Sequence, residues 1–307
     1  MSDKRKTIAF VFLDGVGIGP DDASVNPFFA ADLPVLSSMF GNVIPSSGNS
    51  SVVREHYALV PLDANLNVEG LPQSGTGQTA LFTGINAAEH IGKHFGPYPY
   101  STLLPVIEEH NFFRRIHESG KQFYFANAYP KQFFDYAKKH SRRLTVTTLA
   151  CMLSGLPLHT ADDLRDGIAI SADITNERWG ELGYPDIVPI SEEEAGRRFA
   201  GLASEHDFVL FEYFLTDHAG HKQDMKNAVR ILERFDGFLH GFRDAMDEST
   251  LLVMTSDHGN IEDLRTKTHT RNKVPLWVYG DDSAQFIQGL TSITDLAIKI
   301  LRRLHVA

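Results

Sequence analysis

The chain has 307 residues, 42% of them hydrophobic, and a formal net charge of −10. An acidic chain without a basic block offers little to a phosphate backbone, so nucleic-acid binding is disfavoured. The single cysteine, Cys151, can form neither an internal disulfide nor a thiolate zinc site, so a bound metal would need histidine and carboxylate ligands. No apolar run approaches the ~18 residues of a membrane span. We therefore expect a cytoplasmic protein that binds neither nucleic acid nor membrane.

The first expected element is a strand at 7–13, an unbroken apolar run typical of a strand buried on both faces of a parallel sheet. The basic residues before it imitate the start of a signal peptide. However, Asp14 interrupts the apolar stretch and no small-residue cleavage pattern follows. A second strand is expected at 52–60, and helical periodicity appears near 78–87 and in 101–119.

The middle of the chain is less regular. A short strand is expected at 122–127, and 131–154 predicts a helix, a break and a second helix. Residues 155–190 show no clear period and are punctuated by glycine and proline. Ser191 then begins a helix, because Glu194 stands three residues later in a capping-box pattern.

Strands and helices alternate in the rest of the chain. The expected elements are a strand at 207–214, a helix at 223–246, strands at 250–256 and 274–280, and a helix at 292–304. This alternation predicts an α/β fold, a three-layer sandwich with a mostly parallel central sheet. We expect a single domain over 1–307, with room for at most a small cap within 95–190.

Carboxylates and imidazoles follow or precede several of these strands. In chain order they are Asp14, Asp217, His221, Asp257, His258 and His269. Ligand sites of open α/β sheets form at the carboxyl ends of the strands, so residues far apart in sequence would meet at one edge. Each residue alone has a plainer role as a turn residue, a helix cap or half of a surface ion pair. Together they predict a metal site.

The ligand types narrow the choice of metal. Imidazole and carboxylate without thiolate suit zinc or manganese and also admit magnesium or iron. Six protein ligands are too many for one catalytic metal that keeps an open position. Two metals ~3.5–4 Å apart fit better, because such a pair clamps the attacking and leaving oxygens of a displacement at phosphorus. Two divalent cations would also attract an anionic substrate locally to an acidic protein.

A candidate nucleophile lies in the segment 70–84, where a glycine-containing turn runs into an apolar helix. A bound metal can deprotonate a hydroxyl at this position, and the first N–H groups of the helix can hold phosphate oxygens. The plainer alternative is that Ser74, Thr76 or Thr79 only caps the helix. The residues alone leave Ser74 and Thr76 in competition.

Four blocks of sequence resemble the alkaline phosphatase superfamily, specifically its cofactor-independent phosphoglycerate mutases and phosphopentomutases. They are FVFLDGVGIG at 10–19, GLPQSGTGQTA at 70–80, LTDHAGH at 215–221, and MTSDHGNIED at 254–263 followed by THTRNKVP at 268–275. By this resemblance one metal would be held by Asp14, Asp257 and His258, and the other by Asp217, His221 and His269. The nucleophile of those enzymes precedes a glycine by three positions, as Ser74 precedes Gly77, which favours Ser74, also as a metal-bridging ligand. His218 inherits no role.

The chain also departs from these relatives. Gln78 stands where the mutases have a histidine or a similar polar partner. The phosphoglycerate enzymes insert a large second domain, whereas the segment from Gly84 to Asp207 has only about 120 residues and must also supply core elements. A mutase must retain its dephosphorylated intermediate, so a small cap favours transfer to water.

We therefore expect a two-metal phosphohydrolase that acts on a small phosphorylated metabolite through a phosphoserine intermediate at Ser74. A phosphomutase or phosphotransferase with a reduced cap is the alternative, and a non-catalytic metal-binding protein is the third hypothesis. Residues expected to contact the substrate, unless they merely belong to solvated loops, are Thr76, Lys93, His94 and Arg54. A sulfatase is disfavoured because the segment after Ser74 lacks that family's proline and arginine. A dinucleotide site fails because Pro20 occupies the third-glycine position.

Overall fold

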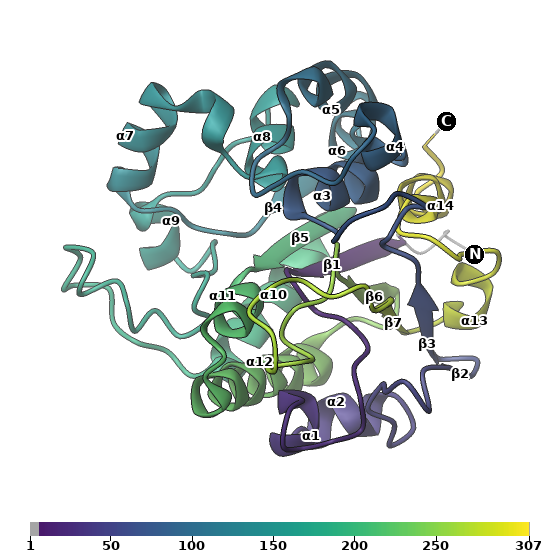
Figure 1. The fold of residues 1–307 in the computed structure, drawn as a ribbon. Helices are drawn as coiled ribbons and strands as arrows, with labels where there is room; N and C mark the ends of the chain where they lie inside the picture. Colours follow the sequence, from purple (N-terminus) through teal and green to yellow (C-terminus); the bar gives the residue numbers. More distant parts are fainter. Residues whose placement is uncertain (1–5, 307) are drawn as a thin grey trace, which may run out of the picture.

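The computed structural model describes residues 6–306 (Figure 1). Lys4 and Arg5, part of the start that imitates a signal peptide, lie outside the described residues. The strands form one sheet in the order β2-β3-β7-β6-β1-β5-β4. They are β1 (Thr7–Leu13), β2 (Val52–Val53), β3 (Tyr57–Leu62), β4 (Phe123–Phe125), β5 (Phe208–Tyr213), β6 (Thr250–Thr255) and β7 (Val274–Tyr279).

The sheet is mixed but mostly parallel. Strand β1 lies at its centre and pairs in parallel with β5 and β6, and β4 pairs in parallel with β5. Strand β7 is antiparallel to both of its neighbours, β6 and β3, and β2 is antiparallel to β3. Strands β7 and β2 therefore run against the other five, and the expected fold class is confirmed.

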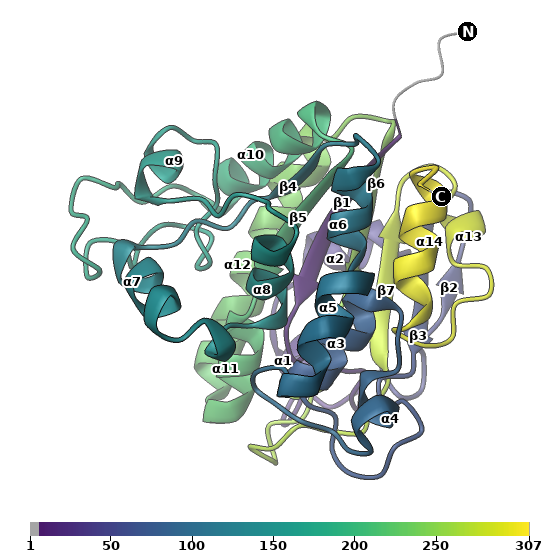
Figure 2. The same cartoon turned by 90° about the horizontal axis from the view of Figure 1, so that it is seen from above.

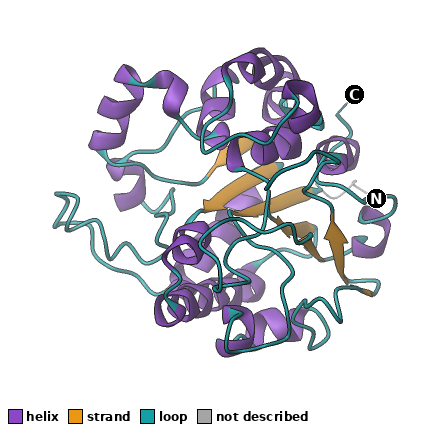
Figure 3. Cartoon of the chain, in the orientation of Figure 1, coloured by secondary structure: helices purple, strands orange, loops and turns teal. Residues whose placement is uncertain are grey.

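Helices cover both faces of the sheet (Figures 2 and 3). Alternate residues of β1 enter two separate cores, with Phe10 and Phe12 on one side and Val11 and Leu13 on the other. The first core is covered by α3 (Ser74–Thr83), α5 (Leu104–His110), α6 (Phe112–Glu118), α8 (Val146–Leu153) and α14 (Asp295–Arg303). The second is covered by α1 (Pro27–Ala30), α2 (Pro34–Met39), α10 (Glu192–Glu205) and α12 (Met225–Ala245). These are the three layers expected from the sequence.

Several expected boundaries differ from the structure. The strand expected at 52–60 is a hairpin of β2 and β3. The helix expected at 78–87 begins at Ser74 instead. The helix expected at 101–119 is interrupted at Asn111, whose side chain accepts from the N–H of Arg114 and begins a new helix. A short helix that was not expected as an element, α11 (Leu215–Lys222), follows β5.

Part of the middle segment stands beside the main layers. Helices α7 (Lys131–Lys139) and α9 (Ala161–Arg165) project on one side of the molecule (Figure 1). A third, small apolar cluster centres on Trp179 and Ile187. We call α7, α9 and residues 166–190 the side unit. The other described helices are α4 (Ala87–Ile91) and α13 (Ser283–Phe286), with single 3₁₀ turns at Ser101–Leu103 and Ser141–Arg143. Within residues 6–306, none of the helices combines the length and the apolar character needed to cross a bilayer.

Candidate metal centre and active site

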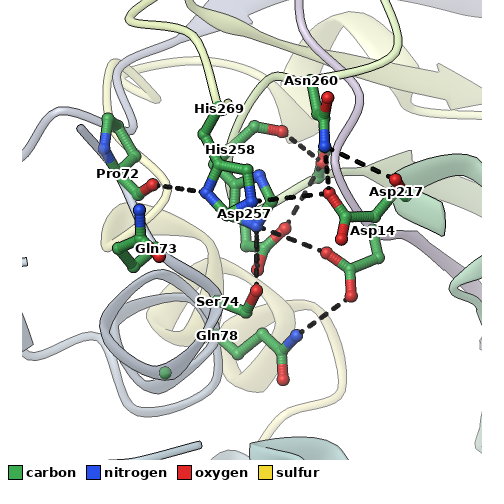
Figure 4. Close-up of polar contacts among 12 residues, drawn as sticks. Asp14, Pro72, Gln73, Ser74, Gln78, Asp217, Asp257, His258, Asn260 and His269 are labelled. Carbon is green, nitrogen blue, oxygen red and sulfur yellow. Dashed lines mark hydrogen bonds and ion pairs between the residues drawn. The ribbon is translucent and has the colours of Figure 1, made fainter. Parts of the chain in front are cut away.

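Two groups of carboxylates and imidazoles converge at one edge of the sheet (Figure 4). The first triad is Asp14, Asp257 and His258, and the second triad is Asp217, His221 and His269. Within each triad, one ligand atom from every residue lies within 4.8 Å of the others. The structure therefore brings together all six residues that the sequence pointed to, in the two sets that the family resemblance implied.

The order of the strands explains this convergence. Strands β6, β1 and β5 are neighbours and parallel, so the residues just after them, Asp257, Asp14 and Asp217, reach the same edge. His269 precedes β7 rather than following it. Because β7 is antiparallel to β6, its first residue starts at the edge where β6 ends, and His269 joins the site.

Two glycines allow the close approach of these segments. Gly15 has φ +68°, and a Cβ at this position would lie 2.5 Å from Oδ1 of Asp217. A Cβ at Gly77 would lie 2.7 Å from the carbonyl oxygen of Asp257. The chain after β1 and the first turn of α3 can thus pack directly against ligand-bearing segments, which a larger residue would push apart.

In the second triad the Nε2 atoms of both imidazoles face each other and the carboxylate of Asp217. Nδ1 of His221 lies 2.6 Å from the carbonyl of Lys267, and Nδ1 of His269 lies 2.7 Å from the carbonyl of Pro72. A carbonyl can only accept, so each Nδ1 carries the proton and each Nε2 of a neutral ring is a free lone pair. The two Nε2 atoms are 3.2 Å apart and lie 3.2 and 3.6 Å from the carboxylate of Asp217.

The hydroxyl of Ser74 contacts the first triad through His258. Nε2 of His258 lies 3.0 Å from Oγ of Ser74, 3.4 Å from Oδ1 of Asp14 and 3.5 Å from Oδ2 of Asp257. Asp257 and His258 are completely buried. The ring of His258 stacks on the ring of His269 at 3.8 Å between centroids, so the two triads are in direct contact.

Burial and neighbouring charges shift the pKa values of this cluster, upward for two residues and downward for two others. Burial, followed by the negative charges of Asp257 and Asp217, holds the pKa of Asp14 well above its usual range. Burial and the charge of Asp217 raise the pKa of Asp257 in the same way. Burial would also raise the pKa of Asp217, but a proton on Nε2 of His221, whose own pKa this contact raises, and the neighbouring imidazoles lower it overall in the metal-free protein. Burial lowers the pKa of His258 to about 3, so this ring is neutral at pH 7.

The donor set fits divalent cations. Oδ1 of Asp14 and Oδ2 of Asp257 are buried and accept no hydrogen bond from the described residues. Within residues 6–306, no lysine or arginine pairs with the three carboxylates. Buried carboxylates are normally paired or coordinate a metal, and neutral imidazole is a common metal ligand. Two cations would satisfy the orphaned oxygens and the facing Nε2 lone pairs at once.

Ser74 is the first residue of α3, and the start of this helix keeps free donors beside it. The N–H of Thr76 donates to Phe95 and that of Gly77 to Gln73. The N–H groups of Ser74 and Gly75 have no acceptor in the described part of the chain. The positive end of the helix dipole and two unused donors suit an anionic group at Ser74.

Residues that the sequence analysis did not single out hold these ligands in place. Nδ2 of Asn260 donates to Oδ1 of Asp217 at 2.7 Å. The buried carboxylate of Glu262 accepts from the N–H groups of Gly17 and Asn260, which ties the chain after β1 to the chain after β6. Ser256 donates to the carbonyl of His258 at 2.9 Å. Asn260 and Glu262 lie within the matched block at 254–263, which was the only signal for them.

The expected substrate contacts are not at the site. Thr76 is buried, donates to the carbonyl of Gln73 and accepts from the N–H of Phe95, so it fastens a loop to α3. Lys93 and His94 line a separate hollow, and His94 lies beside the carbonyl of Val68. Arg54 lies in the hairpin after β2 and donates to the carbonyl of Val53. This placement gives no support to the expectation that these four residues touch a substrate.

Gln78 and His218 do face the site region. Nε2 of Gln78 lies 3.5 Å from Oδ2 of Asp14, and its Oε1 is buried without a hydrogen bond. His218 is exposed beside the ring of Phe214. Both line a cavity of about 560 Å³ that also reaches Ser74 and the two aspartates Asp14 and Asp217. The opposite wall of this cavity comes from the side unit and from residues near it.

Comparison with known proteins supports the resemblance. Residues 190–306 match the model of the Metalloenzyme superfamily, a segment that contains five of the six triad residues. A phosphopentomutase of Mycoplasmopsis pulmonis is 26% identical over 47% of this chain and 34% of its own length. A 2,3-bisphosphoglycerate-independent phosphoglycerate mutase of Methylobacillus flagellatus is 29% identical over 33% of this chain and 21% of its own length. The chain thus spans about a third or less of these two relatives.

Another relative matches more of the chain. A phosphopentomutase of Limosilactobacillus reuteri is 25% identical over 89% of this chain and 72% of its own length. In fold, the chain is similar to a protein of Pyrococcus horikoshii, with a TM-score of 0.60, 14% identity and coverage of 100% of this chain and 98% of the other. It is also similar to the alkaline phosphatase of the Antarctic bacterium TAB5, with a TM-score of 0.51, 14% identity and coverage of 99% and 100%. The resemblance in sequence to the Metalloenzyme superfamily and to phosphopentomutases and phosphoglycerate mutases is therefore confirmed, and the fold is similar to that of an alkaline phosphatase.

Proposed function

We propose that the chain is a two-metal phosphohydrolase that transfers a phosphoryl group from a phosphate ester to Ser74 and then to water. The single observation that carries this proposal is the position of Ser74. Its hydroxyl lies at the start of α3, 3.0 Å from Nε2 of His258, and this Nε2 lies 3.4 and 3.5 Å from the buried carboxylates of Asp14 and Asp257. The alternative role of Ser74 as a helix cap does not explain this contact with His258, and the N-cap residue of α3 is Gln73.

Each triad would hold one divalent cation. The first would be bound by Asp14, Asp257 and His258, with Ser74 as a further ligand, and the second by Asp217, His221 and His269. Bound cations supply positive charge that lowers the pKa of a nearby hydroxyl and stabilises the charge of the transferring phosphoryl group. Zinc or manganese suits these ligands best, and magnesium is the alternative.

The residues of this chain then perform two displacements. Oγ of Ser74 attacks phosphorus, the bond from phosphorus to the ester oxygen breaks, and the serine proton ends on the departing alcohol. Water next attacks the phosphoserine, which restores the hydroxyl of Ser74 and releases inorganic phosphate. The N–H groups of Ser74 and Gly75, which have no acceptor among the described residues, would hold phosphoryl oxygens during both steps.

The size of the side unit favours water as the final acceptor. Helices α5, α6 and α8 from the middle segment pack into the first core, which leaves α7, α9 and residues 166–190 to cover the site. We infer a single metalloenzyme domain over 1–307 with this side unit as a small cap. A cap of this size admits water more readily than a complete second domain, and the mechanism needs water at the phosphoserine.

A phosphomutase remains the second candidate, and one observation favours it. The cavity at Ser74 is bounded on its far wall by residues of the side unit, including Trp179 and Leu182. If this wall closes over the site, a dephosphorylated intermediate could be retained and take the phosphoryl group back at a second hydroxyl. The mutase names of the matching relatives agree with this alternative.

One experiment tests the function and separates the two candidates. The protein, loaded in turn with zinc, manganese and magnesium, is incubated with a panel of phosphate monoesters in water enriched in oxygen-18. The hydrolase predicts inorganic phosphate that carries one solvent oxygen, and it predicts no release in the Ser74→Ala variant. Isomerised ester without phosphate release would establish the mutase instead. No turnover of any ester with any metal would leave the non-catalytic metal-binding hypothesis.

A further inference from the structure

We infer that the cavity beside Ser74 selects phosphate esters whose alcohol carries a flat apolar ring, rather than the esters of polyhydroxylated alcohols. This inference rests on the proposed function, because it concerns the part of the substrate that lies beyond the phosphoryl group. The cavity has a volume of about 560 Å³ and joins the metal centre to the side unit. Pockets of ~300–1,000 Å³ enclose drug-sized ligands, so the phosphoryl group alone leaves most of this space unfilled.

The far wall of the cavity is aromatic. Tyr129 and Phe133 stack with their ring centroids 4.0 Å apart, and both are only half-buried. Phe214 at the end of β5 and Leu182 of the side unit are also half-buried and line the same space. A ligand that covers partly exposed apolar side chains removes them from water, and this burial favours its binding.

Several polar groups on this wall already have partners within the protein, whereas Oε1 of Gln78, which also lines the cavity, has none. The hydroxyl of Tyr129 lies 3.1 Å from Oγ1 of Thr148, which lies 3.0 Å from Oγ1 of Thr145. Nε1 of Trp179 donates to Oγ of Ser171 at 2.7 Å. A sugar-like ligand needs side chains that are free to bond its hydroxyls, and burying an unpaired hydroxyl is costly.

The carboxylate of Asp173, which lies on the same wall, also has its hydrogen-bond partners within the protein. Ser171 donates to Asp173, which also accepts from the N–H groups of Asn176 and Arg178. These internal bonds leave ring faces as the main surface offered to a ligand. Aromatic rings prefer aromatic partners in stacked or edge-to-face contact, which favours a planar ring over a branched alkyl group. Arg178 and His218 also line the cavity and are exposed, so they offer polar contacts at its surface.

The direct test compares two esters whose alcohols leave with similar ease. Phosphate release from 2-phenylethyl phosphate and from ethyl phosphate is measured with the manganese-loaded protein, and glycerol 1-phosphate represents the polyhydroxylated esters. We expect kcat/KM for the phenylethyl ester to exceed both others by about tenfold or more. Equal values, or a preference for glycerol 1-phosphate, would overturn the inference while leaving the proposed phosphohydrolase intact.

Two neighbouring phenylalanines provide a matched pair of variants. Phe133 lines the cavity, whereas Phe134 is not among its lining residues although it is on the same helix. Phe133→Ala should reduce the ratio of kcat/KM between the phenylethyl and ethyl esters by about five- to tenfold. Phe134 contacts Tyr129 and Phe133 edge-on but does not line the cavity, so Phe134→Ala should change the ratio much less than Phe133→Ala. A ratio that responds to neither change, or equally to both, would contradict the proposed wall.

A binding measurement keeps this inference separate from turnover. Of the two tryptophans, Trp179 lines the cavity and Trp277 lies in the second core, so Trp277→Phe leaves Trp179 as the reporter. Benzylphosphonate should change the Trp179 emission and bind at least tenfold more tightly than methylphosphonate. Calorimetry on the unmodified protein gives the same comparison if Trp277→Phe does not fold. Similar affinities for the two phosphonates would reject the inference even if no ester were hydrolysed.

Discussion

The Nε2 atoms of His221 and His269 face each other at 3.2 Å, while the Nδ1 atom of each ring is held by a backbone carbonyl. When both rings are neutral, their two Nε2 lone pairs face each other and repel. The nearby carboxylate of Asp217 adds negative charge. A cation bound by all three residues removes both conflicts, so this pair defines one of the two proposed metal positions.

Loss of His221 should therefore remove one metal. We expect the protein to keep two equivalents of zinc or manganese after desalting, and His221→Ala to keep one, as measured by elemental analysis. His218→Ala is the matched control, because His218 is on the same helix but in neither triad. If His221→Ala retained both equivalents, the assignment of the second triad would be wrong.

We expect Asn260 to increase the metal affinity of the second triad although it is not itself a ligand. Its Nδ2 donates to Oδ1 of Asp217 at 2.7 Å and so fixes the orientation of that carboxylate. Removal of such a supporting hydrogen bond typically costs about 10- to 100-fold in metal affinity. Competition with a chelator should show this loss in Asn260→Ala and no loss in Asn227→Ala, a residue of α12 outside both triads. Unchanged affinity in Asn260→Ala would contradict the supporting role.

Because α3 packs closely against the segment after β6, we expect a side chain at Gly77 to lower the free energy of unfolding. A Cβ at Gly77 would lie 2.7 Å from the carbonyl oxygen of Asp257, so Gly77→Ala should displace the helix that carries Ser74. Overpacking of this kind typically costs about 1–3 kcal/mol in the free energy of unfolding. Gly201→Ala in α10 is the matched control, because no atom lies within 4 Å of the added Cβ. Urea unfolding should show destabilisation only for Gly77→Ala, and equal stability of the two variants would refute the close contact.

The location of the site could be inferred from the sequence because strand ends can be read from apolar runs. Asp14 and Asp257 follow such runs directly, and the α/β alternation places them at one edge. His269 shows where this reasoning was incomplete. A residue before a parallel strand would lie at the opposite edge, and only the antiparallel direction of β7 brings His269 to the site. Strand direction depends on tertiary pairing, which the local pattern does not encode.

The residues that support the metal ligands, and the cavity beside Ser74, could not be predicted from the sequence because they also depend on tertiary contacts. Glu262 joins segments 245 residues apart through its bond to the N–H of Gly17, and nothing in its immediate neighbours signals this. In the sequence Phe133 is indistinguishable from other helix residues, and only the fold shows that it lines the same cavity as Ser74. Arg54, Lys93 and His94 were expected to contact the substrate, but the way in which loops pack around Ser74 depends on the fold and is not encoded in the local sequence.

The buried carboxyl group of Glu212 should make stability depend on pH. Burial raises its pKa from 4.5 to about 7, although a hydrogen bond from Thr147 opposes this. Between these pH values the folded protein keeps a proton that the unfolded chain has released. The free energy of unfolding therefore falls as pH rises from about 4.5 to about 7.

Replacement of Glu212 by glutamine should abolish this contribution. We expect the stability of the metal-free unmodified protein, relative to Glu212→Gln, to fall by up to about 3 kcal/mol between pH 4.5 and 7.5. Urea unfolding of both proteins after EDTA treatment measures the difference. A difference that stays constant across this range would mean that Glu212 is ionised in the folded protein throughout.

The most direct measurement of the central claim is the capture of the phosphorylated enzyme. The metal-loaded protein is mixed with 4-nitrophenyl phosphate, quenched in acid within the first turnovers and digested for mass spectrometry. We predict phosphate on the peptide at Ser74, none in Ser74→Ala, and unchanged labelling in Ser204→Ala, an exposed serine of α10. Full metal-dependent hydrolysis by Ser74→Ala, without a phosphorylated peptide in the unmodified protein, would contradict the covalent mechanism.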